Sequence, residues 1–352
     1  IDLIAGARPN FMKIAPIIDA LKEAKRQGSS LEYRLIHTGQ HYDRAMSGDF
    51  FEQLGIPSPD VNLGVGAGTQ AEQTAAIMMR YEKTLLEQGK SDLCLVVGDV
   101  TSTMACSITA RKLGIPVAHV EGGIRSGDWS MPEEINRVVT DAIANWFFTT
   151  SETANQNLRK AGVDNSRIFF VGNTMIDTLL KQLTCLRPPS FWAELNLQQG
   201  QYIVLTLHRP ANVDSEKKLL QLLHAIADGA SEFPVVFPVH PRTAKNLEEL
   251  EGKISGIHYV DPQGYLEFNW LVKHAKGVVT DSGGITEETT VIGIPCLTLR
   301  DNTERPETIT IGTNELIGTD PSNLSPALAK LMAGQWKKGS IPDMWDGHAA
   351  QR

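Results

Sequence analysis

Residues 278–288 read VVTDSGGITEE, and this stretch says most about the fold. It combines an apolar strand, a Ser-Gly-Gly turn and a helix that opens with two carboxylates. Consecutive glycines let backbone N–H groups approach an anion closely, and a helix N-terminus adds donors and a positive dipole end. Glu288, one turn into the helix, can accept hydrogen bonds from sugar hydroxyls. The pattern fits a nucleotide-sugar diphosphate; the alternative is an ordinary strand–turn–helix whose glutamates favour the helix dipole.

Short β-rich apolar runs alternate with helical patterns along the whole chain. Expected strands cover residues 1–5, 33–37, 93–98, 117–120, 146–149, 168–171, 202–207, 235–239, 257–260, 277–280 and 295–298, and expected helices include 12–25, 70–88 and 102–113. Nearly continuous apolar strands at this spacing predict an α/β fold with doubly wound parallel sheets, covered by helices on both faces.

The chain is long enough for two domains. It has 352 residues, and a domain usually has about 100–200 residues. A helical stretch over residues 173–190 ends in two prolines, which halt regular structure. We therefore expect two Rossmann-like domains, residues 1–172 and 173–352, that face one another across a cleft. Ligands of such sheets bind beyond the carboxyl ends of the strands, and the candidate residues follow expected strands.

Composition excludes several classes of function. A net charge of -8 argues against a nucleic-acid partner, which needs a basic face. The four cysteines have no CxxC spacing, so we expect free thiols of a reducing compartment and no metal site. No apolar run approaches the roughly 20 residues of a membrane span, and no signal peptide is visible. We expect a soluble, cytoplasmic protein. No GxGxxG fingerprint follows the first strand, so no dinucleotide cofactor is expected.

Three carboxylates of the first domain stand at expected strand ends or in a nearby loop. Asp99 follows VVG at residues 96–98, Glu121 precedes two glycines, and Glu133 is the first glutamate of the segment PEEINR. Asp99 is also a plausible cap of the next helix, and a helix preference for Glu in its first turn explains one carboxylate. Carboxylates that converge on one sheet edge raise one another's pKa and supply both an acid and a base. We therefore expect acid/base chemistry there.

Basic side chains also follow expected strands. Arg8 and Lys13 lie in AGARPNFMK at residues 5–13, where a cation is disfavoured by the helix dipole and phosphate binding is the functional interpretation. His208 and His240 end the first two strands of the second domain. A single strand-end histidine is usually structural, but two on one edge favour ligand contact.

Together these segments resemble the non-hydrolysing UDP-N-acetylglucosamine 2-epimerases. The matching segments are, in chain order, GARPNFMK, GDVTST, HVEGGIRS, PEEINR, TLHRP, PVHPR, DSGGITEE, RDNTERPE and the terminal WDGHAAQR. The resemblance covers essentially the whole chain. It implies the glycosyltransferase-B fold, a homodimer, a last helix that packs back on the first domain, and the production of cell-surface polysaccharide precursors.

The resemblance also implies a reaction. UDP-GlcNAc and UDP-ManNAc interconvert by elimination of UDP to 2-acetamidoglucal and readdition, without a nicotinamide or a metal. The positions that match catalytic residues of the family are Asp99, Glu121, Glu133 and His208. The positions that match substrate-binding residues are Arg8, Lys13, Arg137, His240, Phe268, Ser282, Gly283, Gly284, Glu288 and Arg305.

Two departures from the family pattern concern regulation and the sugar. Asn10 stands where the commonest form has Glu, and the segment at residues 40–46 reads QHYDRAM, with Asp43 where an activator-binding Gln is common. A carboxylate there repels a diphosphate, so we expect no activation by a second UDP-GlcNAc. The sugar stays open, because relatives act on 2,3-diacetamido uronic acid derivatives. The same segments are also compatible with a glycosyltransferase of this fold and with a non-catalytic protein that binds nucleotide sugars.

Overall fold

The computed structural model describes residues 1–39, 53–239, 241–248 and 254–352. The chain forms two compact units, one of Ile1–Lys181 with Asp343–Arg352 and one of Gln182–Pro342. The first unit thus extends beyond the expected limit at residue 172. Its last helix, α7 (Thr174–Gln182), is held to the rest of the unit where Thr178 Oγ1 donates to the carbonyl of Met12 at 2.5 Å.

Strands and helices alternate through the first unit. In chain order its elements are β1 (Asp2–Ala5), α1 (Arg8–Arg26), β2 (Arg34–His37), β3 (Val61–Asn62), α3 (Gln70–Gln88), β4 (Cys94–Val97), α4 (Thr101–Lys112), β5 (Val117–Val120), α5 (Pro132–Ile143), β6 (Trp146–Thr149), α6 (Glu152–Lys160), the 3₁₀ helix η1 (Asn165–Arg167), β7 (Ile168–Phe170) and α7.

The second unit repeats the alternation. Its elements are η2 (Ser190–Trp192), β8 (Ile203–Thr206), α8 (Pro210–Val213), α9 (Glu216–Ala230), β9 (Val235–Pro238), α10 (Pro241–Glu248), β10 (Ile257–Val260), α11 (Tyr265–His274), β11 (Gly277–Thr280), α12 (Gly283–Ile292), β12 (Cys296–Thr298), α13 (Pro306–Thr310), β13 (Asn314–Leu316), η3 (Pro321–Asn323) and α14 (Leu324–Met332).

Each unit is built on one parallel sheet with the same strand order. Over the described residues, the first sheet runs β3-β2-β1-β4-β5-β6-β7 and the second runs β10-β9-β8-β11-β12-β13. The order reverses between β1 and β4, and again between β8 and β11. These two switch points are where doubly wound sheets bind their ligands. The predicted α/β class and the predicted strands are confirmed; β3 and β13 were not predicted.

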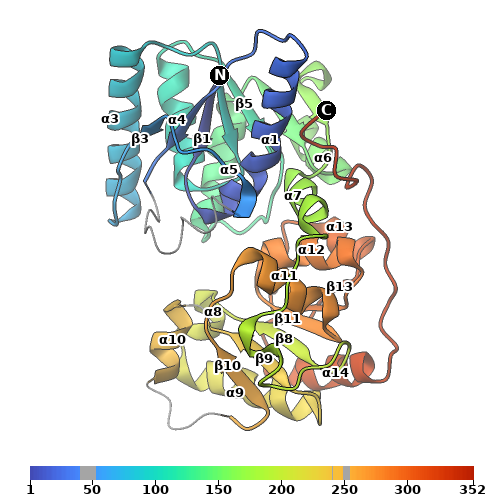
Figure 1. Ribbon diagram of the computed structural model, residues 1–352. Helices are drawn as coiled ribbons and strands as arrows, with labels where there is room; N and C mark the ends of the chain where they lie inside the picture. Colours follow the sequence, from blue (N-terminus) through green and yellow to red (C-terminus); the bar gives the residue numbers. More distant parts are fainter. Residues whose placement is uncertain (40–52, 240, 249–253) are drawn as a thin grey trace. The chain divides into compact units, whose positions relative to one another are not determined.

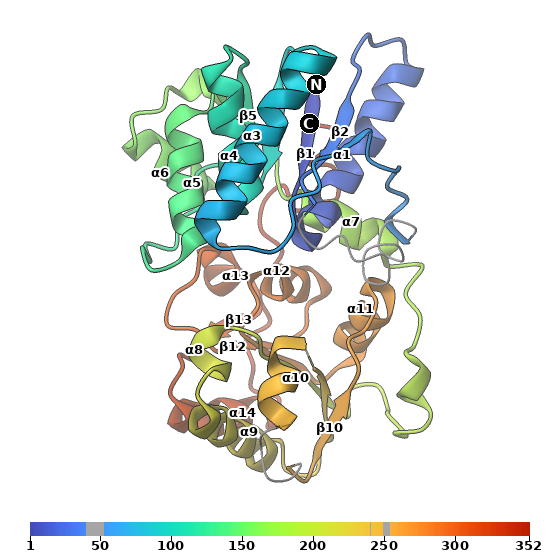
Figure 2. The same cartoon turned by 90° about the vertical axis from the view of Figure 1, so that its left-hand side faces the viewer.

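Helices cover both faces of each sheet, which explains why the strands are apolar throughout. In β8, Ile203 and Leu205 pack with α9 and α14, whereas Val204 packs with α11 on the other face (Figure 1). In the first unit, α3 and α4 lie side by side on one face (Figure 2), and their side chains join those of the strands in one core.

The end of the chain packs on the first unit. Trp345 is buried and its Nε1 donates to the carbonyl of Thr150 at 2.9 Å. The backbone N–H groups of Ala349 and Ala350 donate to the two carboxylate oxygens of Asp177, at 3.1 and 2.8 Å. Residues 345–352 form turns rather than the helix start suggested by the resemblance.

The helices of the two units are formed by amphipathic or short segments of the chain. In the described part of the chain, none of them combines the length and the apolar character needed to cross a bilayer.

Candidate active site

Loops after β1, β4 and β5 meet around Gly98. Lys13 Nζ and Glu121 Oε2 form an ion pair at 2.7 Å, with both side chains buried. Gly98 has a φ of 69°, and a Cβ built there lies 3.4 Å from Lys13 Nζ, 3.5 Å from Glu121 Oε2 and 3.6 Å from Asn10 Nδ2. The structure therefore brings Lys13, Glu121 and Asn10 together around Gly98, whose left-handed backbone favours glycine at this position.

The side chain of Asn10 supports this arrangement through three hydrogen bonds to the backbone. Its Oδ1 accepts from the backbone N–H groups of Gly6 and Ala7, both at 3.2 Å, and its Nδ2 donates to the carbonyl of Val97 at 2.9 Å. A glutamate, the commoner residue at this position in the family that the sequence resembles, cannot make that donation when it is ionised. The chain thus uses an amide to tie the β1 loop to the end of β4.

Glu121 has an unusual backbone. Its φ is 70°, in the left-handed region that side-chain-bearing residues rarely adopt. The neighbouring backbone holds it there, because its own N–H donates to the carbonyl of Phe148 at 2.8 Å and the N–H of Gly98 donates to that of Val120 at 3.0 Å. Strain of this kind persists where the surroundings fix it, and it clusters at functional sites.

Asp99 does not cap α4. The N-cap of that helix is Val100, which provides no side-chain hydrogen bond. Asp99 Oδ2 instead pairs with Arg137 Nη2, and its carbonyl accepts from Asn136 Nδ2 at 2.8 Å. The Asp99 side chain is 26% exposed, whereas that of Arg137 is buried. The carboxylate of Asp99 is therefore held by α5, and its side chain stays partly accessible to solvent.

The two glutamates that open α5 differ in their surroundings. Glu134 is buried and accepts from the N–H groups of Ser126 and Gly127 at 2.9 and 3.0 Å, and from Arg137 at 3.1 Å. Burial raises its pKa, but these hydrogen bonds outweigh burial and the pKa is lowered. Glu133 is half-buried, and within the described residues its carboxylate makes no hydrogen bond. Glu134 is thus structural, and Glu133 is the carboxylate available for chemistry.

In the second unit a histidine–aspartate pair stands at the switch point. His208 follows β8, and its Nδ1 lies 2.8 Å from Oδ1 of Asp281, which follows β11. Asp281 has no exposed surface and also accepts from the N–H of Arg209 at 2.9 Å and from Asn212 Nδ2 at 3.1 Å. Burial raises the pKa of Asp281, but His208 and these donors outweigh burial and lower it.

This pair orients a partly exposed imidazole. The His208 side chain is 40% exposed, and a carboxylate at Nδ1 sets the ring so that Nε2 points the other way. The sequence analysis identified His208 and missed Asp281, although the residue lies inside the quoted 278–288 stretch. Asp281 directly follows a strand. This position in the sequence could have identified it as a candidate site residue.

The start of α12 keeps its backbone accessible. Ser282 is the N-cap, and Ser282, Gly283 and Gly284 are all partly exposed. A Cβ at Gly283 would lie 3.0 Å from Oε1 of Glu304, which pairs with Arg300 at 2.5 Å. The glycine therefore allows charged groups to come close to the first turn, where N–H groups and the helix dipole favour an anion.

The two glutamates of α12 have separate partners. Glu287 pairs with Arg305, and both are buried. Glu288 is buried beside Tyr265 and Asn269, whose Nδ2 lies 3.5 Å from Glu288 Oε1. Burial raises the pKa of Glu288 to about 7. The hydrogen bonds of Tyr265 and Asn269 lower this pKa in part, and the negative charge of Glu287 raises it slightly. Phe268 lies half-buried on α11 and packs against the core.

Some predicted site residues cannot be placed. His240 and residues 40–46 lie outside the described residues, and for Arg8 the structure describes the backbone at the start of α1. Their proposed roles stay predictions.

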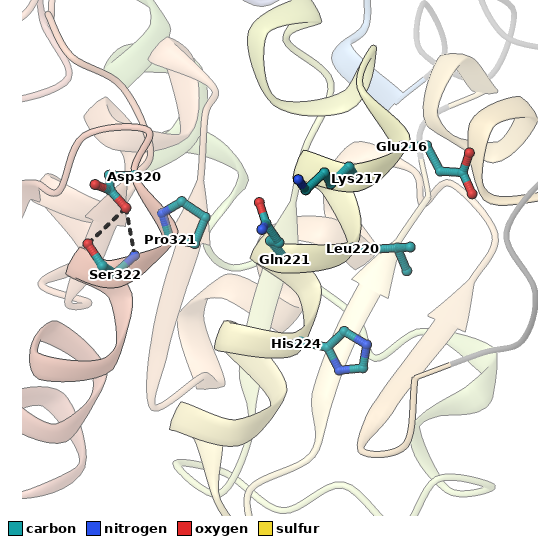
Figure 3. Close-up of a pocket in the computed structure, with 8 residues that line it drawn as sticks. All are labelled: Glu216, Lys217, Leu220, Gln221, His224, Asp320, Pro321 and Ser322. Carbon is teal, nitrogen blue, oxygen red and sulfur yellow. Dashed lines mark hydrogen bonds between the residues drawn. The ribbon is translucent and has the colours of Figure 1, made fainter.

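A surface hollow of about 830 Å³ on the second unit contains none of the predicted residues. It lies between α9 and the turn at η3 (Figure 3). Its Asp320 carboxylate is occupied by Ser322, which donates from its N–H at 2.9 Å and its Oγ at 2.8 Å. Since it is an open surface groove that includes neither His208 nor Asp281, it carries no functional assignment.

Comparison with known proteins identifies relatives of the whole chain. The sequence model of the UDP-N-acetylglucosamine 2-epimerase family matches residues 22–352. The UDP-N-acetylglucosamine 2-epimerase of Methanocaldococcus jannaschii is 41% identical over 93% of this chain and 91% of its own length. The UDP-2,3-diacetamido-2,3-dideoxy-D-glucuronate 2-epimerase of Pseudomonas aeruginosa is 39% identical over 90% of this chain and 87% of its own. A crystal structure of the M. jannaschii enzyme with UDP-GlcNAc and UDP has a TM-score of 0.87, with 39% identity, over 100% and 97% of the two chains.

The raised pKa of Glu288 makes a prediction about stability. Its pKa is 4.5 ordinarily and about 7 in the native protein, so the native state holds a proton in this range that the unfolded chain releases. The resulting stability is fully present below pH 4.5 and is lost as the pH rises through 7. In Glu288→Gln this dependence is absent. We subtract the free energy of unfolding of the wild type from that of the variant, both measured by urea denaturation. We expect this difference to rise by about 3 kcal/mol as the pH increases across that window. A difference that stays constant with pH would contradict the assignment.

Proposed function

Because the chain belongs to the UDP-N-acetylglucosamine 2-epimerase family, we propose that it inverts C2 of UDP-GlcNAc to give UDP-ManNAc. The UDP-GlcNAc and UDP bound by the M. jannaschii enzyme support this substrate, since that structure matches essentially the whole chain. The reaction proceeds by elimination of UDP and its readdition. Its product serves as a precursor of cell-surface polysaccharides.

The reaction needs one base and one acid. In the first half a base takes the C2 proton, the C–H electrons form the C1=C2 double bond of 2-acetamidoglucal, and UDP leaves with the electrons of the C1–O bond. In the second half a UDP oxygen attacks C1, and an acid returns a proton to the opposite face of C2. No electrons are gained or lost overall, so two positioned proton-transfer groups suffice.

The buried Lys13–Glu121 pair beside Gly98 is the observation that carries the proposal. It places a carboxylate at the switch point of the first sheet, directly next to the loop of Asp99 and close in the chain to Glu133. These three carboxylates supply the acid and the base. The Lys13 ammonium compensates Glu121 and favours the developing charge of the diphosphate.

The second unit holds the UDP part of the substrate in this proposal. Ser282, Gly283 and Gly284 offer N–H groups at the start of α12, and Arg305, which pairs with Glu287 one turn further along this helix, adds a cation. Ionised Glu288 accepts hydrogen bonds from the ribose hydroxyls. His208, oriented by Asp281, exchanges protons with the departing and returning diphosphate.

One relative favours a second candidate substrate. The P. aeruginosa enzyme, 39% identical, is named for a UDP-2,3-diacetamido uronic acid. The inversion at C2 is the same for that sugar, so the carboxylates keep their roles. The choice depends on groups that meet the substituents at C3 and C6. The homodimer expected from the resemblance stays a prediction.

A substrate panel tests the function. We expect UDP-GlcNAc alone, with no acceptor, to be converted to UDP-ManNAc, as followed by proton NMR of the sugar. Conversion restricted to the 2,3-diacetamido uronic acid analogue would select the second candidate. No conversion of either sugar without an acceptor would refute an epimerase and leave a glycosyltransferase or a binding protein.

Single substitutions separate chemistry from binding. We expect Asp99→Asn, Glu121→Gln and Glu133→Gln each to lower kcat by about 10²-fold or more, because each removes a proton-transfer group. Their Kd for UDP, measured by calorimetry, stays near the wild-type value. Glu288→Ala weakens UDP binding instead. Glu152→Gln, an exposed carboxylate on α6, is the control that changes neither. Carboxylate variants that lose UDP binding and keep kcat would reverse these roles.

A further inference from the structure

β5 buries a histidine that no step described above uses. His119 has no exposed surface. Its Nε2 lies 2.8 Å from the carbonyl oxygen of Gly98, and its Nδ1 lies 2.7 Å from Oδ1 of Asp141 in α5. The ring therefore connects the peptide that precedes Asp99 with the helix that begins beside Glu133.

Both ring nitrogens of His119 face hydrogen-bond acceptors. A carbonyl oxygen only accepts, so Nε2 carries a hydrogen. Burial raises the pKa of Asp141, but the charges and hydrogen bonds of His119 and Arg125 outweigh burial and the pKa is lowered. The Asp141 carboxylate lies 2.7 Å from Nδ1. The ring is therefore held between two acceptors, the carbonyl of Gly98 and the carboxylate of Asp141.

The second oxygen of Asp141 fixes the loop that follows β5. Its Oδ2 accepts from the N–H of Gly123 at 2.9 Å and from Arg125 Nη1 at 2.6 Å. Gly123 has a φ of 84°, and a Cβ there would lie 2.4 Å from the carbonyl oxygen of Ala154. The loop therefore has little room to shift, and its first residue is Glu121.

We propose that His119 and Asp141 are positioning residues for the epimerase reaction. Through Gly98 they fix the peptide that carries Asp99, and through Gly123 they fix the loop that carries Glu121. The inference rests on the proposed roles of those two carboxylates. Neither member of the pair contacts the substrate; each acts by holding an acid or a base in place.

The reaction is sensitive to such positioning. Proton transfer requires heavy atoms within hydrogen-bond reach, so a displacement of about 1 Å costs roughly 10²-fold in rate. Groups that only orient a catalytic carboxylate are expected to affect kcat and to leave the affinity for UDP nearly unchanged, because they alter none of the UDP contacts proposed for the start of α12. A purely structural pair would affect stability alone.

Three substitutions dissect the pair. His119→Gln keeps a donor near the place of Nε2, and His119→Asn keeps a donor near the place of Nδ1. Asp141→Asn keeps one acceptor but turns an NH₂ group toward Gly123 and Arg125. We expect Asp141→Asn and His119→Asn to lower kcat by about 10- to 100-fold, with KM and the Kd of UDP within about twofold of wild type. His119→Gln restores part of the loss, because the bond to Gly98 is kept.

Asp2→Asn is the matched control. Asp2 is a buried carboxylate of the same unit that accepts from Arg34 at 2.9 Å and Tyr81 at 2.8 Å, at the amino end of β1. We expect it to lower the thermal midpoint as Asp141→Asn does, with kcat unchanged. Wild-type kcat in Asp141→Asn and His119→Asn, with only the thermal midpoint reduced, would overturn the proposal.

The same series identifies a failure of the proposed function. If Asp99→Asn and Glu121→Gln keep full turnover, the assigned carboxylate roles fail, whatever the two positioning variants do. If Asp99→Asn loses turnover and His119→Asn does not, the positioning proposal alone falls.

Discussion

Much of the first unit depends on the buried ion pair of Lys13 and Glu121 at the switch point of its sheet. A buried charge is strongly unfavourable unless it is compensated, so the helix after β1 and the loop after β5 have to meet. Gly98 provides the left-handed turn beside the pair, and Asn10 bonds to the end of β4. Glu121 adopts a left-handed backbone conformation where it pairs with the ammonium of Lys13. The parallel strand order makes this possible, because it brings three strand ends to one edge.

The second unit uses the same strand order with different chemistry. At its switch point a buried aspartate orients a partly exposed histidine, and the helix after β11 opens with two glycines. The first unit thus concentrates carboxylates at its strand ends, and the second concentrates donors and an imidazole. That division matches the two tasks of an epimerase that eliminates and readds UDP, namely moving a proton at carbon and holding a diphosphate.

The sequence predicted most of the architecture, because strands that are buried on both faces are apolar throughout and hard to miss. It missed β3 and β13, which have two and three residues and little apolar character. The domain limit expected at residue 172 lies before α7, whereas the structure includes most of this helix in the first unit. The two prolines that suggested a boundary lie after the helix. The contact of Thr178 with Met12 joins residues 166 positions apart, and no local pattern reveals it.

Prediction of the site was uneven for a similar reason. Strand-end carboxylates and glycine turns are visible in the sequence, so Asp99, Glu121 and Glu133 could be named as candidates. Residues that act through another side chain were not: Asp281, His119 and Asp141 are defined by partners far away in the chain. The sequence does not distinguish Glu133 from its neighbour Glu134. The structure does, because the carboxylate of Glu134 accepts hydrogen bonds from the backbone N–H groups of Ser126 and Gly127.

The central claim is that the chain moves a proton at C2 by acid/base chemistry on a UDP-sugar. Turnover of UDP-GlcNAc in D₂O, with the product examined by NMR and mass spectrometry, tests it most directly. Elimination discards the C2 proton, and readdition takes one from a group that exchanges with solvent, so the UDP-ManNAc formed should carry one deuterium at C2. Product that retains protium at C2 would contradict proton abstraction and require another route to inversion.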